Sequence, residues 1–164
     1  MIWSCFIGNK LGPIAFIDGT VKKEVYVSML EEYFLPFLDA IYTDDPTTHE
    51  FQQDNTRPHI AKMTHDWFKC LAEKYDLRLM EWPANSPDMN PIEQLWAHLK
   101  AELHRRYPDT FSLQGSPQFI KATLRQRLYE VWWDIGADVL DRLVESMPER
   151  VEKLFKARGW YTDC

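Results

Sequence analysis

Two acidic residues are notable for the segments that carry them. Asp54 is expected to be the last residue of a short strand, Glu50 to Asp54. Glu93 follows Asn90 and Pro91, a pattern typical of a helix start, because Asn is a favourable N-cap and Pro suits the first helical turn. Functional side chains of α/β sheets gather where strands end, so we expect the two carboxylates to lie close together.

The chemistry that suits these carboxylates is two-metal phosphoryl transfer. Two Mg²⁺ ions about 4 Å apart bridge a scissile phosphate, activate the attacking oxygen and stabilise the leaving one. Mg²⁺ prefers oxygen ligands, and Mn²⁺ accepts the same set. Such a pair needs roughly three carboxylates from separate elements. Asp54 and Glu93 supply two. Asp18 is the only nearby candidate for a third, but it is a turn residue, and we do not assign it this role.

Each carboxylate also has a structural explanation that the sequence leaves open. Asp54 followed by Asn55 is typical of an Asx-turn that closes a strand. Glu93 stands three residues after Asn90, which is capping-box spacing, and a negative charge suits a helix N-terminus. The flanking polar residues admit ordinary packing or surface roles as well, namely Arg57 and His59.

Hydrophobic periodicity predicts an α/β fold with helices on the faces of a sheet. Residues 1–17 alternate as a hairpin, and strands are expected at 50–54 and 77–82. Helices are expected at 21–42, 59–75, 90–106, 117–135 and 139–157. Pro36 is expected to kink the first helix, and Gly159 to cap the last.

Composition restricts the class of protein. The 164 residues are 45% hydrophobic and 14% aromatic, which is sufficient for a packed core, and no apolar run approaches a membrane span. Three cysteines without ligand spacing favour a reducing compartment over a disulfide framework or a zinc site. The net charge of -6 disfavours a stand-alone DNA-binding module. We therefore expect an intracellular protein, nuclear or cytoplasmic, that is not secreted.

Several ordered motifs run through the chain. They are Gln53-Asp54-Asn55 with Arg57-Pro58-His59, Trp82-Pro83 with Ser86-Pro87-Asp88, Asn90-Pro91-Ile92-Glu93 with Leu95-Trp96, and Ser146-Met147-Pro148 with Arg150. With these motifs the sequence resembles the DDE transposases of the mariner superfamily, in the Tc/mariner-like branch that uses glutamate as third carboxylate. The resemblance covers essentially the whole chain.

The resemblance implies a ribonuclease H-like fold that cuts and joins DNA with Mg²⁺ or Mn²⁺. It assigns Asp54 and Glu93 as catalytic metal ligands, matching the second and third carboxylates of the family. It also assigns the supporting residues, which are Asn55, Arg57, His59 and Asn90. The implied partner is DNA at transposon ends, with a homodimer as one candidate assembly and no membrane.

Two departures from the family pattern shape the expectation for this chain. The segment between Asp54 and Glu93 is longer than usual, with the extra residues expected around Ala72 to Asp76. The family's first strand, which carries the first catalytic Asp, precedes the hairpin with which this sequence begins. We therefore expect an incomplete ribonuclease H-like domain over 1–107, lacking that strand in its mixed sheet, and a helical extension over 108–164. A truncated, inactive relic is the expected state.

Two alternatives remain at the level of sequence. One is a domesticated nucleic-acid- or protein-binding module that kept the fold and presents its basic residues to phosphates, namely Lys100, Arg105, Arg106, Lys121, Arg125 and Arg127. The acidic total favours ordinary solvated helix faces for these residues. The other is a ribonuclease H-like nuclease of another family, against which the block from Asn90 to Trp96 argues.

Overall fold

The N-terminal segment folds as the predicted hairpin, in two short antiparallel ladders. The computed structural model describes residues 1–44, 47–83 and 86–157. Strand β1 (Ile2–Trp3) pairs with β4 (Ala15–Phe16), and β2 (Phe6–Ile7) pairs with β3 (Lys10–Leu11). Gly8 adopts a φ of 52° between β2 and β3, which glycine tolerates best. Residues 1–17 thus form two antiparallel arms.

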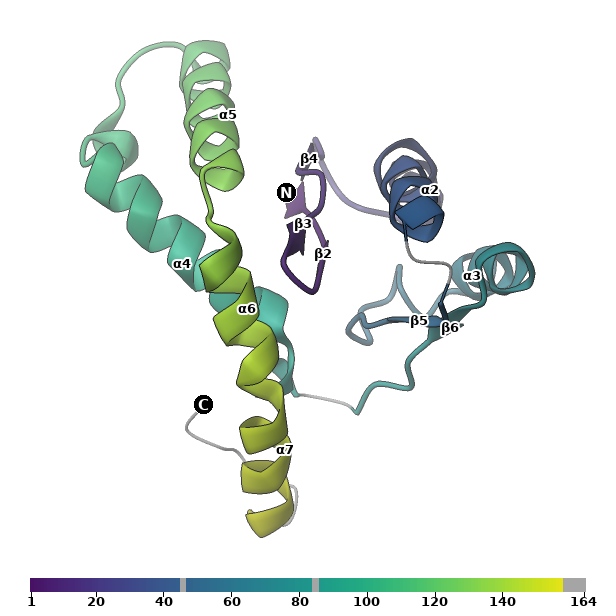
Figure 1. The fold of residues 1–164 in the computed structure, drawn as a ribbon. Coiled ribbons are helices and arrows are strands. Elements are labelled where there is room, and N and C mark those ends of the chain that lie inside the picture. The colour runs from purple at the N-terminus through teal and green to yellow at the C-terminus, as the bar shows by residue number, and fades with distance from the viewer. Residues whose placement is uncertain (45–46, 84–85, 158–164) are drawn as a thin grey trace.

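The hairpin forms the middle of three layers, because its side chains alternate between two cores. Trp3, Cys5, Ala15 and Ile17 pack in a core with the helices that lie between residues 23 and 75. Their neighbours pack on the opposite face with helices that lie between residues 91 and 145, namely Ile2, Phe6, Ile14 and Phe16. Figure 1 shows the hairpin between these two helical groups. The period of two in the sequence therefore corresponds to two buried faces.

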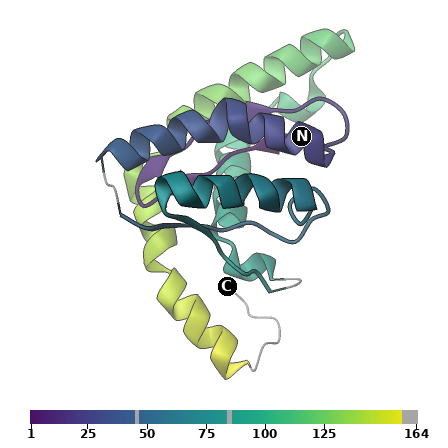
Figure 2. The ribbon, with the colours of Figure 1, turned by 90° about the vertical axis from the view of Figure 1, so that its right-hand side faces the viewer.

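The first helical layer contains α1 (Lys23–Met29), a π-helical turn (Leu30–Phe34), α2 (Leu35–Asp44) and α3 (Lys62–Tyr75). Figure 2 shows α2 and α3 side by side across one face. The predicted irregularity lies just before Pro36. Because proline has no N–H and its ring crowds the preceding turn, the helix widens over Leu30–Phe34 and then continues.

A parallel strand pair completes this side of the molecule. Strand β5 (His49–Phe51) pairs with β6 (Leu77–Leu79), and α3 forms the crossover between them. The prediction that Asp54 ends the strand is wrong, because β5 stops at Phe51. Beyond the paired residues, Met80 N donates a hydrogen bond to Phe51 O at 2.9 Å. Because β6 ends at Leu79, the paired register does not extend to Asp54. Asp54 lies in the loop that follows.

The helix predicted from His59 begins instead at Lys62. His59 N and Ile60 N both donate to Thr56 O, at 2.9 and 3.1 Å, so this segment forms a tight turn. Ala61 is extended at ψ 142° and occupies the N-cap position of α3, without a capping hydrogen bond from its side chain. His59 is thereby part of the loop that carries Asp54 and not of α3.

The second helical layer follows Met80. It contains a 3-10 turn (Pro87–Met89), α4 (Pro91–Arg106), a 3-10 turn (Thr110–Ser112), α5 (Pro117–Trp133), α6 (Ala137–Glu145) and α7 (Met147–Lys156). The single helix predicted over 139–157 is wrong, because the helix breaks at Ser146, ahead of the helix-breaking Pro148. The predicted cap at Gly159 lies outside the described residues.

The core on this side joins segments far apart in the sequence. Leu95 and Leu99 of α4 pack with Val131 and Trp132 of α5, and Trp132 Nε1 donates to Gly12 O of the hairpin at 2.9 Å. The neighbouring Trp133 is 46% exposed. The division at 107/108 remains a prediction. Over the described ranges, the helices are too short or too polar to cross a membrane.

Candidate active site

A cavity of about 860 Å³ lies between the hairpin, β5 and the start of α4. Residues 1–8 line one wall and residues 49–54 line another. Asp54 and Glu93 both line this cavity, although they belong to different elements. The structure thus brings the two predicted carboxylates to one cleft.

The Asp54 carboxylate is held by its own loop. Its Oδ1 accepts a hydrogen bond from Thr56 N at 3.1 Å, which is the Asx-turn that the sequence left open. The same Oδ1 lies 2.6 Å from His59 Nδ1. Among the described residues, Oδ2 has no hydrogen-bond partner, and the side chain is 47% exposed. The turn therefore orients the carboxylate and leaves one oxygen available to a ligand.

The His59 ring packs against the buried ring of Tyr26. The His59 and Tyr26 rings lie 4.3 Å apart between centroids. The Tyr26 hydroxyl donates to Gln53 Oε1 at 2.8 Å, and Gln53 Nε2 donates to His59 O at 3.4 Å. Burial, aided by the nearby Asp54 charge, raises the pKa of the Tyr26 hydroxyl above its ordinary value of 10, so Tyr26 remains a donor. A chain of buried contacts thus positions the group that orients Asp54.

Glu93 lies in the first turn of α4, as predicted. Asn90 is the N-cap, with Oδ1 accepting from Ile92 N at 3.4 Å. The Asn90 N–H donates to Pro87 O at 3.0 Å, so this N–H is satisfied without a capping-box bond from the Glu93 side chain. Glu93 is exposed at the cavity. Its carboxylate is therefore available to a cation, near the favourable end of the helix dipole.

Gln52 connects the elements that carry the two carboxylates. Its Nε2 lies 3.2 Å from Asn90 Oδ1 and 3.4 Å from Met89 O. The segment after β5 is thereby tied to the cap of α4. Sequence analysis did not single out Gln52 or Tyr26, because neither residue type signals a site without its spatial partners.

The remaining supporting residues have other positions. Asn55 Nδ2 donates to Trp82 O at 2.7 Å and so joins the Asp54 loop to the segment after β6. Arg57 is exposed, and it is not among the described residues that line the cavity. Asn55 and Arg57 therefore act at the rim at most, whereas His59 and Asn90 contact the site directly.

Asp18 is engaged elsewhere. It lies 2.6 Å from Lys121 Nζ and 2.7 Å from Arg125 Nη2. The hydrogen bond from Lys121 lowers the pKa of Asp18. Nor is the thiol of Cys5 suited to a metal, since burial raises its pKa. Over the described ranges, no cluster of three His, Cys, Asp or Glu side chains could hold a metal ion.

The donor set at the cavity suits a hard cation. Asp54 and Glu93 offer oxygen ligands only, from a loop and from a helix start, which matches the preference of Mg²⁺ and Mn²⁺. Glu50 also lines the cavity, but among the described residues no three His, Cys, Asp or Glu side chains are grouped to hold a metal ion, so the set fits a two-metal centre only as a part of it.

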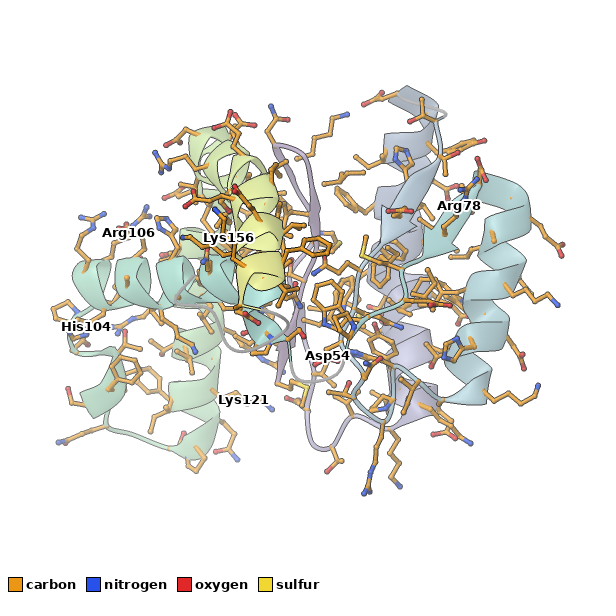
Figure 3. The ribbon with its side chains drawn as sticks, turned by 90° about the horizontal axis from the view of Figure 1, so that it is seen from below. Asp54, Arg78, His104, Arg106, Lys121 and Lys156 are labelled. Carbon is orange, nitrogen blue, oxygen red and sulfur yellow. The ribbon has the colours of Figure 1, made fainter. Side chains whose placement is uncertain are left out.

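Most of the basic residues considered for nucleic-acid binding are paired with acids. Arg105 and Arg106 contact Glu102, Arg106 also contacts Asp134, and the others pair with Asp18 or Asp109, namely Lys121, Arg125 and Arg127. In Figure 3, Asp54 lies between the helical layers, whereas Arg106 and His104 lie on the outer side of the α4 layer. The paired charges do not favour a basic binding patch.

The chain matches the family model described as DDE superfamily endonuclease over residues 9–114. It is 33% identical over 162 residues to the transposable element Tcb1 transposase of Caenorhabditis briggsae, covering 99% of this chain and 53% of the relative. It is 29% identical to the Tc1 transposase of Caenorhabditis elegans, with the same coverage. The chain thus spans about half the length of these relatives.

Solved structures share the fold. The Mos1 transposase catalytic domain, in a structure with Raltegravir and Mg, aligns with a TM-score of 0.74 at 19% identity, covering 99% of this chain and 75% of that one. The Mos1 paired-end complex with the left transposon end aligns with a TM-score of 0.68 at 20% identity, covering 98% and 43%. This likeness confirms the predicted ribonuclease H-like fold.

Proposed function

Because this chain belongs to the DDE superfamily of endonucleases, we propose that its cavity is part of a centre that cleaves and joins DNA with two Mg²⁺ or Mn²⁺ ions. The supporting observation is that Asp54 and Glu93 line one cavity and that Gln52 ties their elements together. When bound, the ions supply an activated nucleophile and stabilise the leaving oxygen.

The residues of the chain have distinct tasks in this proposal. Asp54 and Glu93 hold the ions. His59 and the Thr56 amide fix the rotamer of Asp54, so that Oδ2 is directed to the ligand. Asn90 begins α4 at the correct place for Glu93. Such preorganisation matters because small displacements of a ligand cost considerable activity.

We propose that a third carboxylate comes from a segment outside residues 1–164, because among the described residues no three His, Cys, Asp or Glu side chains are grouped to hold a metal ion. Two carboxylates balance the charge of two dications poorly and define their geometry loosely. The cavity of about 860 Å³ offers room for an extended segment, because residues 1–8 and 49–54 both line it and β1 and β5 each pair on one side only in the described structure. We propose that a strand carrying the third carboxylate enters there, and that the 164 residues alone are catalytically inactive.

The experiment is a nicking and joining assay on labelled duplex DNA that carries transposon ends. The 164-residue chain should be inactive with Mg²⁺ or Mn²⁺. A polypeptide extended upstream by a strand that ends in Asp and by a DNA-binding segment should be active, and Asp54→Asn or Glu93→Gln should reduce its rate at least about a hundredfold. Activity of the short chain that survives Asp54→Asn would refute the assignment.

The partner proposed is DNA at transposon ends, bound with help from a DNA-binding segment beyond these residues. The Mos1 complex contains a left transposon end, which motivates this choice. A homodimer is proposed from the family resemblance, and a nuclear or cytoplasmic location from the three cysteines without disulfide spacing. Inactivity of the extended polypeptide on every transposon-end duplex would favour the binding-module alternative.

A further inference from the structure

Arg150 is a buried cation outside the cavity. It lies on α7 and is 3% exposed. A buried charge is costly unless its hydrogen-bonding groups are satisfied. The groups that Arg150 contacts should therefore satisfy the hydrogen bonds of its guanidinium.

The guanidinium of Arg150 contacts three elements. Nη1 donates to Asp88 O at 3.0 Å, Nη2 donates to Gln94 Oε1, and Nε donates to Ser146 Oγ at 3.0 Å. All three acceptors are uncharged oxygens, and within the described ranges Arg150 forms no ion pair. Its role is thus geometric: a planar fork with fixed donor directions joins three segments.

Two of these contacts flank Glu93. Asp88 belongs to the 3-10 turn before α4, and Gln94 follows Glu93 directly. The cap residue Asn90, which accepts from Gln52, lies between the two contacts. The guanidinium therefore fixes the short segment from which the Glu93 carboxylate enters the cavity.

We propose that Arg150 is a positioning residue for Glu93: it holds residues 88–94 so that the carboxylate meets the metal. This inference rests on the proposed function, because it takes Glu93 as a metal ligand. Lysine is the informative substitution. It retains the charge, but it is shorter, and a single ammonium cannot reproduce the fork that reaches Asp88 and Gln94 together.

The first test is hydrogen exchange of the 164-residue chain without metal. Arg150→Lys should accelerate exchange of the Asn90 and Glu93 amides by about tenfold, as the loss of a charge-assisted hydrogen bond implies. The matched control is Arg142→Lys on α6, an exposed arginine paired with Asp138. Its exchange in residues 88–94 should match the unsubstituted chain. Unchanged exchange in Arg150→Lys would overturn the proposal.

The second test is a double-mutant cycle on Mn²⁺ affinity, measured by electron paramagnetic resonance of free Mn²⁺. Arg150→Lys should raise the Kd about tenfold, as loss of an outer-shell contact typically does. In a Glu93→Gln background, Arg150→Lys should change the Kd for Mn²⁺ by less than about twofold. Thermal melts verify that each variant is folded, and Arg142→Lys is again the control.

The outcomes separate the two proposals. An equal effect of Arg150→Lys with and without Glu93 would mean that Arg150 only supports the fold, and it would overturn the positioning role. If Glu93→Gln weakens Mn²⁺ binding but Arg150→Lys does not, the positioning role of Arg150 is overturned and the proposed function stands. Unchanged Mn²⁺ affinity in Glu93→Gln would refute the metal site itself, and with it the positioning role of Arg150.

Discussion

At the scale of single residues, the structural role of Asp54 is compatible with the metal-ligand role that we propose for it. The sequence offered an Asx-turn and a metal ligand as alternatives, and the structure shows that the turn uses Oδ1 only. The orientation depends on His59, and His59 depends on Tyr26 and Gln53. No motif could predict that support, because it links residues that are distant in sequence through one buried hydrogen bond.

Removal of the Tyr26 hydroxyl should therefore destabilise the site. Tyr26→Phe leaves Gln53 Oε1 without its donor in a buried position, which should reduce the free energy of unfolding by about 1–2 kcal/mol. Urea denaturation measures the change. Tyr129→Phe, at a residue 53% exposed, is the control and should be neutral. Equal stability of the two variants would contradict the account.

Asp18 should contribute a pH-dependent term to stability. Its folded pKa lies below the ordinary value of 3.8, mainly because Lys121 donates a hydrogen bond to it. The ion pairs therefore stabilise the fold above the ordinary pKa, and this contribution is lost as the pH falls through the lowered folded pKa. The Tm of Asp18→Asn should be below that of the unsubstituted chain at pH 5–7, and the two should converge towards about pH 2. A difference that persists in acid would argue against this pairing.

At the scale of elements, the sequence correctly predicted a helix start that depends on local capping residues, but it misplaced strand and helix ends that depend on remote or overlooked residues. Asn90 and Pro91 correctly marked the start of α4, because capping is a local interaction. The end of β5 was misplaced because it depends on how far β6 extends, and β6 is remote in sequence. The helix predicted over 139–157 ignored Pro148, whose effect appears as the break at Ser146.

The cap of α4 should matter to the site beyond its effect on the helix. Asn90→Ala removes the cap and the contact with Gln52, and should cost about 1 kcal/mol or more. Ser116→Ala removes the comparable cap of α5, far from the cavity, and should cost a similar amount. Only Asn90→Ala should weaken Mn²⁺ binding. Equal Mn²⁺ affinities in the two variants would show that the cap is structural only.

At the scale of the molecule, two cores share one hairpin. Alternation along residues 1–17 predicted a hairpin and an α/β fold, but it did not reveal that both faces are buried, because a short apolar pattern is compatible with one or two packed faces. The cavity between the hairpin and β5 also could not be derived from sequence. It is lined by β1 and β5, whose other edges meet no partner strand in the described structure.

These edges should make the 164-residue chain self-associate. Unpaired strand edges beside an apolar cavity are templates for further strands. Sedimentation velocity should show concentration-dependent oligomers, and a covalently added strand that fills the cavity should shift the chain towards smaller species. A monomeric profile together with a sharp cooperative melt of the unmodified chain would contradict this expectation.

The central claim is that Asp54 and Glu93 bind metal together, and anomalous diffraction from crystals soaked in Mn²⁺ tests it most directly. The account predicts a Mn²⁺ peak about 2.1–2.2 Å from an oxygen of Asp54, with the two carboxylates within about 8 Å of each other. Glu93→Gln should weaken this peak. A Mn²⁺ peak away from the cavity, or carboxylates on opposite sides of the sheet, would contradict the account.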